Sequence, residues 1–542
     1  MIVFSFQRTK LNWKFCDLTC QNILYEGGHH VASIVKSFAI SGVDGYLVDV
    51  ETKTIEGMPL ISIVGLGDTA VKEARERVEA ALRDGRFRFP EMKVVINLAP
   101  SDMKKSGSHF DLPIALGLLM ETDQLNTRRW KDFGCIGELS LNARLRRCTG
   151  VLPMVIAAKK TGITNIIVPR ENIHEASLVK GINVIGFDSL REVVEFLAGD
   201  TEYNIQQQEH FASPEADPYP VDFKEVQGQE AMIEYIVVAA AGGHNLLMIG
   251  APGCGKSMIA KRIPTILPSM TEEEALEVSK IYSVAGMLNG RGHLVAERPF
   301  RAPHHNASTN ALIGGGNHAT PGEISLAHNG VLFLDEIAEF SKKTLEALRQ
   351  PMEDQQVTIS RMKYSNTYPA NFMLAAAMNP CPCGYYGNIK CRCTDYEVIK
   401  YRQRLSGPIL DRMDIQKYVQ PVNFISLSSS FSGKSSKELR ERVEFARNIQ
   451  KKRFAKIKGI NCNAQMGHSL IKECCQLEEE GYRLLQLAHD RFKYSARTYH
   501  KYLKVARTFA DMEDSSKTRK KDVASALMAR DLEKERAGMM VL

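Results

Sequence analysis

One eight-residue segment constrains the fold of this chain more than any other feature of its sequence. The segment fits the pattern G-x-x-x-x-G-K-[ST], follows an apolar run (245–250) and precedes a stretch of helical character. Its residues are Gly250, Ala251, Pro252, Gly253, Cys254, Gly255, Lys256 and Ser257. In such a strand–loop–helix unit the glycines let the backbone wrap a phosphate, and successive N–H groups at the helix start bind the anion. We therefore expect a parallel α/β domain in which Lys256 reaches the β- and γ-phosphates of ATP and Ser257 ligates Mg²⁺.

A second motif lies 79 residues beyond Lys256. The apolar run 330–336 ends in Asp335 and Glu336, which a parallel sheet would place at its carboxyl edge, where ligands bind. We expect Asp335 to hold Mg²⁺ and Glu336 to polarise the attacking water. Each motif alone has an ordinary explanation, because Gly-rich turns occur by chance and buried strands often end in an acid. Together the two motifs predict ATP binding and hydrolysis.

Four stretches of the sequence resemble one family of ATPases. They are GAPGCGKS, GVLFLDE, AAMNPCPCGYYG and SGPILDRMD, and they are similar to the AAA+ ATPases of the magnesium-chelatase-like group, specifically the bacterial YifB/ComM family. The resemblance runs from about residue 34 to about residue 532. It implies ATP and Mg²⁺ as ligands, a homo-oligomer in the form of a hexameric ring, and, from the role associated with ComM, branch migration of DNA.

The same resemblance suggests roles for three polar residues outside the two motifs. Asn379, at the end of the apolar run 371–380, resembles the sensor residue that positions the lytic water, although a turn asparagine is the ordinary alternative. Arg412 resembles the arginine finger that enters a neighbouring subunit's site, with Arg402 and Arg404 as nearby rivals. Arg497 resembles the second sensor on the helical lid, or is one more arginine on a basic helix face.

The chain is too long for one ordinary core, so several domains are expected from its 542 residues. Its N-terminal part alternates short strands with helices and, through residues 137–169 above all, resembles the Lon-protease fold. We expect a poorly ordered extension (1–33), a Lon-like α/β domain (34–200), a polar linker (201–220), an AAA+ core (221–425) and a helical lid (426–542).

The Lon-like domain lacks the Ser–Lys pair with which Lon enzymes cleave peptides. Where the serine would fall the chain has His109, and where the lysine would fall it has Leu152. Ser108 and Lys159 lie close by but out of register, although a shift of one residue would restore Ser108. Because both nucleophile and base are missing, the sequence predicts a proteolytically inactive domain.

Four of the twelve cysteines are clustered within thirteen positions. Cys381, Cys383, Cys391 and Cys393 form two C-x-C pairs separated by seven residues. Four thiolates can hold a structural Zn²⁺, although C-x-C departs from the commoner C-x₂₋₄-C spacing and reduced thiols or a redox pair remain alternatives. The remaining cysteines do not form a disulfide framework, which favours a reducing compartment.

The basic residues are concentrated towards the C-terminus. Residues 431–459 contain ten Lys/Arg and three Glu, and residues 491–507 contain six Lys/Arg and no acid, within a chain of net charge +7. Two further segments could carry basic pore loops. The first, 298–316, holds Arg298, Arg301, His304 and His305; the second, 356–374, reads as a hairpin with Arg361, Lys363 and Tyr364 near its tip. Phosphate contacts and base stacking would suit single-stranded or branched DNA, although solvated basic helices are common.

Two other functions are compatible with the motifs. A magnesium-chelatase-like motor would remodel a protein partner without DNA, and an ATP-dependent Lon-like protease would use the N-terminal domain. No apolar run reaches the 18 residues of a membrane span and no signal peptide is visible, so we expect a cytoplasmic ATPase that acts on DNA.

Overall fold

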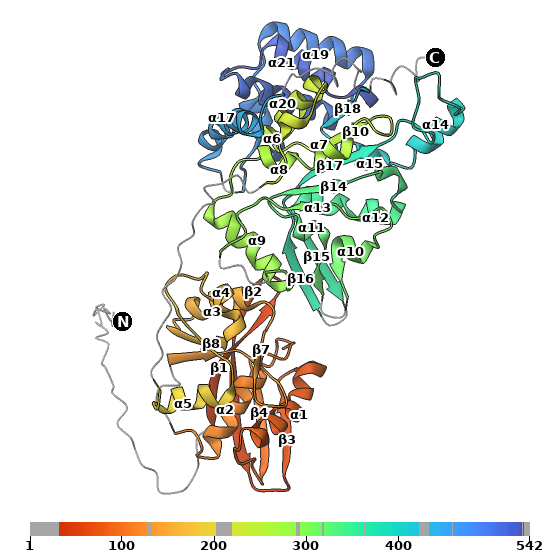
Figure 1. The fold of residues 1–542 in the computed structure, drawn as a ribbon. Helices are drawn as coiled ribbons and strands as arrows, with labels where there is room; N and C mark the ends of the chain where they lie inside the picture. Colours follow the sequence, from red (N-terminus) through yellow and green to blue (C-terminus); the bar gives the residue numbers. More distant parts are fainter. Residues whose placement is uncertain are drawn as a thin grey trace, which may run out of the picture.

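The computed structural model describes most of the chain in two α/β units and a helical bundle (Figure 1). The described residues are 32–126, 132–201, 219–288, 293–316, 319–361, 364–421, 433–457, 459–533 and 535. Nearly all of the expected extension (1–33) and linker (201–220), as well as Lys363, lie outside this range. Among the described helices, none has the length and apolar character needed to cross a bilayer.

The N-terminal unit is built on a mixed seven-stranded sheet with the order β3-β4-β2-β1-β5-β8-β9. Strands β1, β2 and β4 pair antiparallel, and the others join in parallel. The strands are β1 (Ser33–Ser41), β2 (Asp44–Ile55), β3 (Leu60–Val64), β4 (Lys93–Ala99), β5 (Phe133–Cys135), β8 (Asn165–Pro169) and β9 (Asn183–Phe187), with a small hairpin of β6 (Glu138–Leu139) and β7 (Leu145–Arg146).

Helices cover both faces of this sheet. One face carries α1 (Thr69–Asp84), α2 (Asp111–Glu121) and α5 (Leu190–Ala198), and the other carries α3 (Val151–Lys160) and α4 (Ile173–Ala176). Residues 69–83, rich in Ala, Glu and Arg, predict a helix, and α1 forms there. Asp68 caps α1 by accepting a hydrogen bond from the Val71 N–H (3.0 Å). Its buried side chains recur at helical spacing, as a helix lying on a sheet requires.

The second unit is a five-stranded sheet in which every pairing is parallel, with the order β11-β14-β17-β10-β18. Its strands are β10 (Leu246–Ile249), β11 (Phe300–Arg301), β14 (Val331–Leu334), β17 (Met373–Met378) and β18 (Ile415–Tyr418). Alternate residues of each central strand enter two different cores, such as Leu246 in one and Leu247 in the other. Both faces are therefore covered, which explains why the three predicted strands are continuous apolar runs.

The helices of the second unit divide between these two cores. The first core contains α6 (Glu230–Gly242), α7 (Lys256–Ala260) and α8 (Ile263–Ile266). The second face carries α10 (Thr309–Ile313), α11 (Glu323–Leu326), α12 (Lys342–Ala347), α15 (Gly407–Leu410) and the antiparallel hairpin of β15 (Gln356–Arg361) and β16 (Tyr364–Pro369). The hairpin confirms the sequence prediction for residues 356–369. The short elements α13 (Arg349–Asp354), α14 (Asp395–Arg402), β12 (Gly314–Gly315) and β13 (Thr320–Pro321) complete the unit.

The C-terminal bundle packs on the first core rather than forming a separate one. It consists of α17 (Ser436–Phe454), α18 (His468–Cys474), α19 (Glu479–Phe492), α20 (Ala496–Met512) and α21 (Lys520–Met528). Leu439 of α17 and Val505 of α20 belong to the same buried cluster as Ile236 of α6. The sequence predicts one helix over 470–490, and this is wrong: the chain breaks between α18 and α19, where the Glu478 N–H bonds to the Thr518 carbonyl (3.0 Å) instead.

Helix α9 (Glu272–Val284), inserted between α8 and β11, joins the two α/β units (Figure 1). Val278 of α9 is buried in the same cluster as Val155 of α3. The Ser283 hydroxyl donates to the buried carboxylate of Glu175 (2.5 Å), and the Gly150 N–H donates to the Ser283 carbonyl (3.1 Å). The interval 256–335 is long for a bare strand–helix–strand connection, which predicts an insertion. The Lon-like unit docks on this insertion through α9.

Candidate nucleotide site and its surroundings

The phosphate-binding segment forms a loop between β10 and α7, at the carboxyl edge of the parallel sheet. The Gly250 N–H donates to the Met378 carbonyl of the adjacent strand β17 (3.1 Å), which fixes the start of the loop. Gly253 and Gly255 adopt φ values of +79° and +91°, in the left-handed region that side chains disfavour. Helix α7 begins directly afterwards at Lys256, so the backbone is shaped to wrap an anion at a helix start.

The side chains predicted to bind nucleotide and Mg²⁺ converge at this edge. The Ser257 hydroxyl donates to Asp335, just beyond β14, at 2.6 Å. The Lys256 ammonium donates to the carbonyls of Gly250 (2.7 Å) and Ala251 (3.0 Å), and lies 3.4 Å from the side-chain oxygen of Asn379, just beyond β17. Three segments separated by up to 123 residues thus meet where the sequence analysis places them. A hydroxyl beside a carboxylate is an oxygen pair suited to Mg²⁺.

Glu336 follows Asp335 directly and adopts an unusual backbone conformation. Its φ of 48° and ψ of 46° are left-handed, and its N–H donates to the preceding Asp335 carboxylate (3.0 Å). The side chain is 53% exposed, and its carboxylate lies 3.6 Å from Nδ1 of His305. A half-exposed carboxylate next to Ser257 and Asp335 can polarise a water molecule. No local spacing in the sequence links His305 to Glu336, so His305 was not predicted as a neighbour of this site.

The two arginines of residues 298–316 are not free basic groups of a projecting loop, whereas residues 302–308 do form a partly exposed loop that includes His304. Residues Phe300 and Arg301 form β11, an edge strand of the central sheet. The Arg301 guanidinium makes two hydrogen bonds to Glu323 (2.6 and 2.7 Å). The Arg298 side chain is 13% exposed and donates to Glu274 (3.0 Å) and to backbone carbonyls. Both arginines therefore have internal ion-pair partners, which the sequence pattern alone could not reveal.

Arg412 and Arg497 lie together, but at the opposite edge of the sheet. Both arginines line a cavity of about 790 Å³. The cavity lies at the amino ends of the strands, because its lining includes Asn245, which directly precedes β10, and Phe372, which directly precedes β17. Arg412 donates to the Pro408 carbonyl (2.8 Å) and pairs with Glu353, so its side chain is only 11% exposed. Neither arginine is thus placed to contact a nucleotide at the P-loop of its own chain.

The two rival arginines have partners within their own subunit. Arg402 is almost buried and donates to Glu535 (2.8 Å) and to the Pro380 carbonyl (3.2 Å). Arg404 donates to both carboxylate oxygens of Glu339 (2.7 and 2.8 Å). Among the three candidates, Arg412 is the arginine that lines the cavity at the amino edge.

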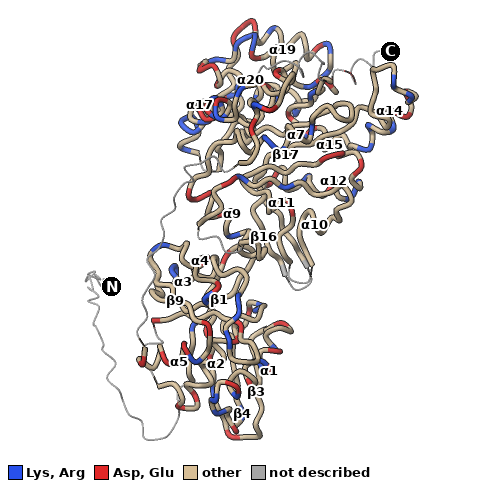
Figure 2. Tube along the Cα trace, viewed as in Figure 1, with Lys and Arg blue, Asp and Glu red and all other residues tan. Residues whose placement is uncertain are grey.

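The cavity carries several further basic groups. Lys501 of α20 lies 3.4 Å from a carboxylate oxygen of Asp414, and burial lowers the pKa of Lys501 to about 8. The cavity lining also includes Arg298, Arg447, Lys451 and Lys504, with Glu273, Glu274, Glu277, Glu353 and Asp411 as acids. In Figure 2 the basic and acidic residues are interspersed over the whole molecule, α17 included.

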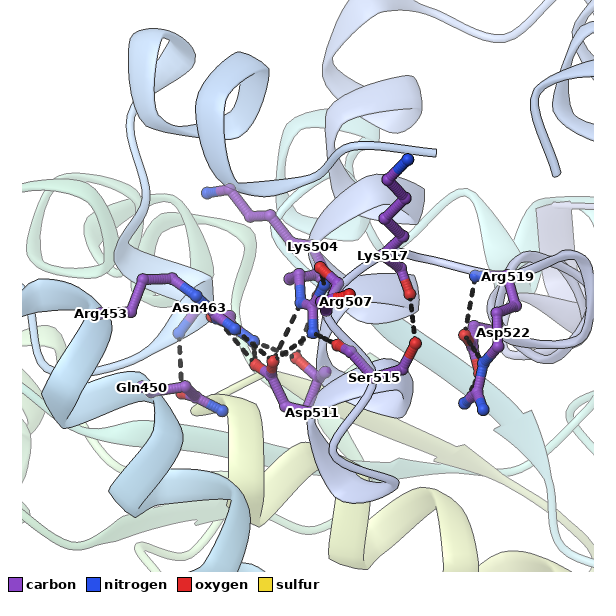
Figure 3. A network of polar contacts seen from close by, with 12 residues as sticks. Gln450, Arg453, Asn463, Lys504, Arg507, Asp511, Ser515, Lys517, Arg519 and Asp522 are labelled. Atoms are coloured by element: carbon purple, nitrogen blue, oxygen red, sulfur yellow. Dashed lines mark hydrogen bonds and ion pairs between the residues drawn. The ribbon is translucent and has the colours of Figure 1, made fainter. Parts of the chain in front are cut away.

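A buried polar network in the lid reaches this cavity (Figure 3). Asp511 accepts hydrogen bonds from Arg507 (2.7 and 2.9 Å), Arg453 (2.9 Å) and Asn463 (2.8 Å). The Thr508 hydroxyl, which accepts from Asn463 (3.0 Å), is 2.9 Å from Nε2 of the buried His244. On its other side, Nδ1 of His244 lies 3.6 Å from Asp414, two residues beyond Arg412. The bundle is therefore tied to the segment that carries Arg412.

The four clustered cysteines lie directly beyond Asn379. Their sulfur atoms are all within 4.8 Å of one another, and three of the separations are 3.4, 3.7 and 3.9 Å. In a tetrahedral site with metal–sulfur distances of about 2.3 Å, the sulfurs would be about 3.8 Å apart. The backbone N–H groups of Arg392 and Tyr385 lower the pKa of Cys383 to about 6. Cys381, Cys383, Cys391 and Cys393 thus have the chemistry and spacing of a Cys₄ metal site.

The residues expected at a Lon-type active site do not form a Ser–Lys pair. Ser108 donates to Glu138, and Lys159 donates to the Lys180 carbonyl (2.6 Å). His109 is 6% exposed, and its Nε2 has no hydrogen-bond partner among the described residues. Leu152 is fully buried at the start of α3. The geometry offers no activated nucleophile of the Ser–Lys kind.

Comparisons with known proteins match these three parts of the chain. The families described as "Magnesium chelatase, subunit ChlI", "Subunit ChlI of Mg-chelatase" and "Magnesium chelatase, subunit ChlI C-terminal" match residues 222–427, 50–172 and 433–530. The competence protein ComM of Haemophilus influenzae is 41% identical over 503 residues, which are 91% of this chain and 96% of the relative.

Two further relatives agree with this assignment. YifB of Escherichia coli is 40% identical over 503 residues, 93% of this chain and 97% of the relative. Lon protease 2 of Bacillus subtilis is 26% identical over 201 residues, 32% of this chain and 36% of the relative, in keeping with a Lon-like component of the fold. The chain therefore belongs to the magnesium-chelatase-like AAA+ family that includes ComM and YifB.

Proposed function

We propose that this protein is an ATPase that forms a hexameric ring of identical subunits, as its family resemblance implies, and couples ATP hydrolysis to movement on DNA. The observation that carries the proposal is the convergence of Lys256, Ser257 and Asp335 at the carboxyl edge of the sheet. The similarity to a protein named for competence supports DNA as the substrate of the motor.

Each residue of the site has a distinct task in this proposal. The P-loop N–H groups and Lys256 bind the phosphates, and Ser257 and Asp335 hold Mg²⁺. The bound Mg²⁺ neutralises charge on the phosphate oxygens. Glu336 polarises the attacking water, and the Asn379 amide, close to Lys256, orients it. Nothing in this set supplies a positive charge from the far side of the γ-phosphate, which is the task of an arginine finger.

We assign that task to Arg412 of a neighbouring subunit, with Arg497 acting from the same surface. The P-loop and the cavity that holds both arginines lie at opposite edges of one sheet. A head-to-tail contact between identical chains brings unlike edges together, and such contacts close into rings. To reach a neighbour, Arg412 must leave Glu353, whose side chain is 55% exposed.

A structural zinc ion at the four cysteines completes the proposal. All four sulfurs would be ligands, so no coordination position remains for catalysis. Metal analysis of the purified protein tests this directly: about one zinc per chain is expected. Protein that folds and hydrolyses ATP with Mg²⁺ but contains no zinc would contradict it.

The alternative function is a chelatase-like motor that remodels a protein partner, which the family name favours. Steady-state ATPase assays with single-stranded, duplex and branched DNA across a salt series separate the two functions. Stimulation by DNA that weakens steeply with salt is expected if several phosphates are bound. Vigorous ATP hydrolysis that no DNA changes at any salt concentration would favour protein remodelling, and absence of hydrolysis would contradict both.

A further inference from the structure

The loop that carries the four cysteines touches the phosphate-binding loop. Gly384, between Cys383 and the second pair, has a φ of +84° and lies against Pro252. A Cβ atom at Gly384 would be 2.6 Å from Cδ and 2.8 Å from Cγ of Pro252, and 3.9 Å from Cγ of Asn379. A separation below 3.0 Å is too short for carbon atoms, so the two loops are in direct contact with no room for a side chain.

The cysteine loop is also continuous with the polar residue at the end of β17. Cys381 follows Asn379 by two residues and is fully buried, and its sulfur lies 3.4 Å from that of Cys383. The Gly384 N–H donates to the Cys381 carbonyl (3.0 Å), which closes the first turn of the loop. A metal bound to these sulfurs would therefore restrain the backbone on both sides of the contact with Pro252.

The rest of the loop has little packing of its own. The side chain of Ile389 is fully exposed, and that of Tyr385 is 36% exposed. Arg402 provides the main anchor: its guanidinium lies 4.9 Å from the centre of the Tyr386 ring and donates to the Pro380 carbonyl. A segment with so few buried side chains needs another source of order, which four sulfur ligands would supply.

We propose that a zinc-class cation at Cys381, Cys383, Cys391 and Cys393 controls the affinity of the nucleotide site, because the loop it orders holds Pro252 and Asn379 in place. The inference rests on the proposed binding of ATP. A purely structural zinc would only stabilise its own loop. Here the metal occupancy of the cysteines also determines whether the P-loop has the conformation that binds phosphate. The ligands are thiolates at tetrahedral spacing, so Zn²⁺ is preferred over Mg²⁺, which favours oxygen.

The chain offers a matched pair of variants for this test. Gly384→Ala retains all four cysteines but places a methyl group against Pro252. Gly387→Ala lies in the same loop at a similar φ of +81°, yet a Cβ there meets nothing within 4 Å. Both variants carry the same backbone strain, so a difference between them reports the contact with the P-loop.

The measurement is the dissociation constant of a fluorescent ATP analogue at fixed Mg²⁺, with zinc content determined on the same samples. For wild-type protein, a zinc-selective chelator should weaken binding about tenfold, or about 1.4 kcal/mol, and added ZnSO₄ should restore it. Gly384→Ala should retain its zinc and bind about tenfold more weakly, while Gly387→Ala binds like wild type. The double variant Gly384→Ala/Pro252→Ala lacks the Cδ and Cγ atoms of Pro252 that would clash with the new methyl group. It should therefore recover part of the nucleotide affinity that Gly384→Ala loses.

Three results would overturn the inference while leaving the ATPase proposal intact: no zinc in the purified protein, equal affinity with and without zinc, or equal affinity of the two alanine variants. If zinc-loaded wild-type protein bound no nucleotide at all, the ATPase proposal itself would fail, and this inference with it.

Discussion

In the proposed function, different single residues at the carboxyl edge of the sheet serve nucleotide binding and hydrolysis. Lys256 faces the loop carbonyls and the end of β17, whereas the Glu336 side chain is 53% exposed. Lys256→Ala should therefore abolish nucleotide binding, because it removes the cation that meets the phosphates. An equilibrium binding assay with a fluorescent ATP analogue checks this expectation, and unchanged affinity would contradict the assignment.

Glu336→Gln should leave binding unchanged and lower the ATP turnover rate by about 10²–10⁴-fold, because the amide cannot accept a proton from water. Glu339→Gln is the matched control. Glu339 belongs to the same turn but pairs with Arg404 at the surface. Steady-state ATPase assays on both variants decide the matter: comparable losses from the two substitutions would show that Glu336 has no special role.

His109 makes the stability of the Lon-like unit depend on pH. Burial lowers the pKa of His109 to about 4, below the value of about 6.5 in an unfolded chain. The unfolded chain therefore takes up the proton first, so the contribution of His109 to stability is fully present above pH 6.5 and is lost as pH falls towards 4. Between pH 7 and pH 5 the loss should be about 2 kcal/mol.

Hydrogen exchange of residues 32–201 in the full-length protein measures this loss. His109→Gln has no proton to take up in this range, so its protection should change less between pH 7 and pH 5 than that of wild type. Parallel losses in the two proteins would contradict the assignment of this dependence to His109.

The position of a single side chain can be predicted from the sequence only when its partners lie close to it along the chain. Lys256 and Ser257 are fixed by the eight-residue loop, so their placement follows from the motif. Arg298 is different: its partner Glu274 and the Asn329 carbonyl lie 24 and 31 residues away, and no pattern indicates them. The approach of His305 to Glu336 depends likewise on β11 and β14 being neighbours in the sheet.

At the scale of elements, the buried network around Asp511 holds the lid together (Figure 3). Asp511 is fully buried and pairs with Arg507 of its own helix and Arg453 of α17. Asp511→Ala should destabilise the bundle by about 3–5 kcal/mol, because it leaves buried guanidinium groups without their counter-charge. Glu479→Ala breaks an exposed pair with Arg483 and should cost at most about 0.5 kcal/mol.

Thermal unfolding of the two lid variants gives the comparison. A clear fall in the midpoint for Asp511→Ala and almost none for Glu479→Ala is expected. Similar midpoints would mean that the network does not stabilise the bundle.

Helices and strands were predictable where the number of covered faces sets the pattern of apolar residues along the segment. β10, β14 and β17 are apolar throughout because both faces are covered, and α1 shows helical spacing because only one face is covered. The break between α18 and α19 was not predictable, since it depends on a bond from Glu478 to Thr518, forty residues further along the chain. The docking of α9 on the Lon-like unit is likewise a contact between distant segments.

At the scale of the whole molecule, the phosphate-binding loop and the two candidate arginines lie at opposite edges of one sheet and do not meet within one subunit. The P-loop lies at the carboxyl edge of the parallel sheet, and Arg412 and Arg497 line the cavity at its amino edge. The Lon-like unit is fixed to α9, whose Glu274 and Glu277 line the same cavity. Ring assembly would therefore bring the P-loop of one subunit to a surface shaped by both α/β units of the next.

A mixing experiment tests this central claim most directly. Lys256→Ala and Arg412→Ala proteins should each lack ATPase activity. When the two are assembled together at equal amounts, about a quarter of the interfaces combine an intact P-loop with an intact arginine, so about a quarter of the wild-type rate should return. Co-purification through a tag on one variant establishes that mixed rings form. Mixed rings that remain inactive would contradict a site shared between subunits.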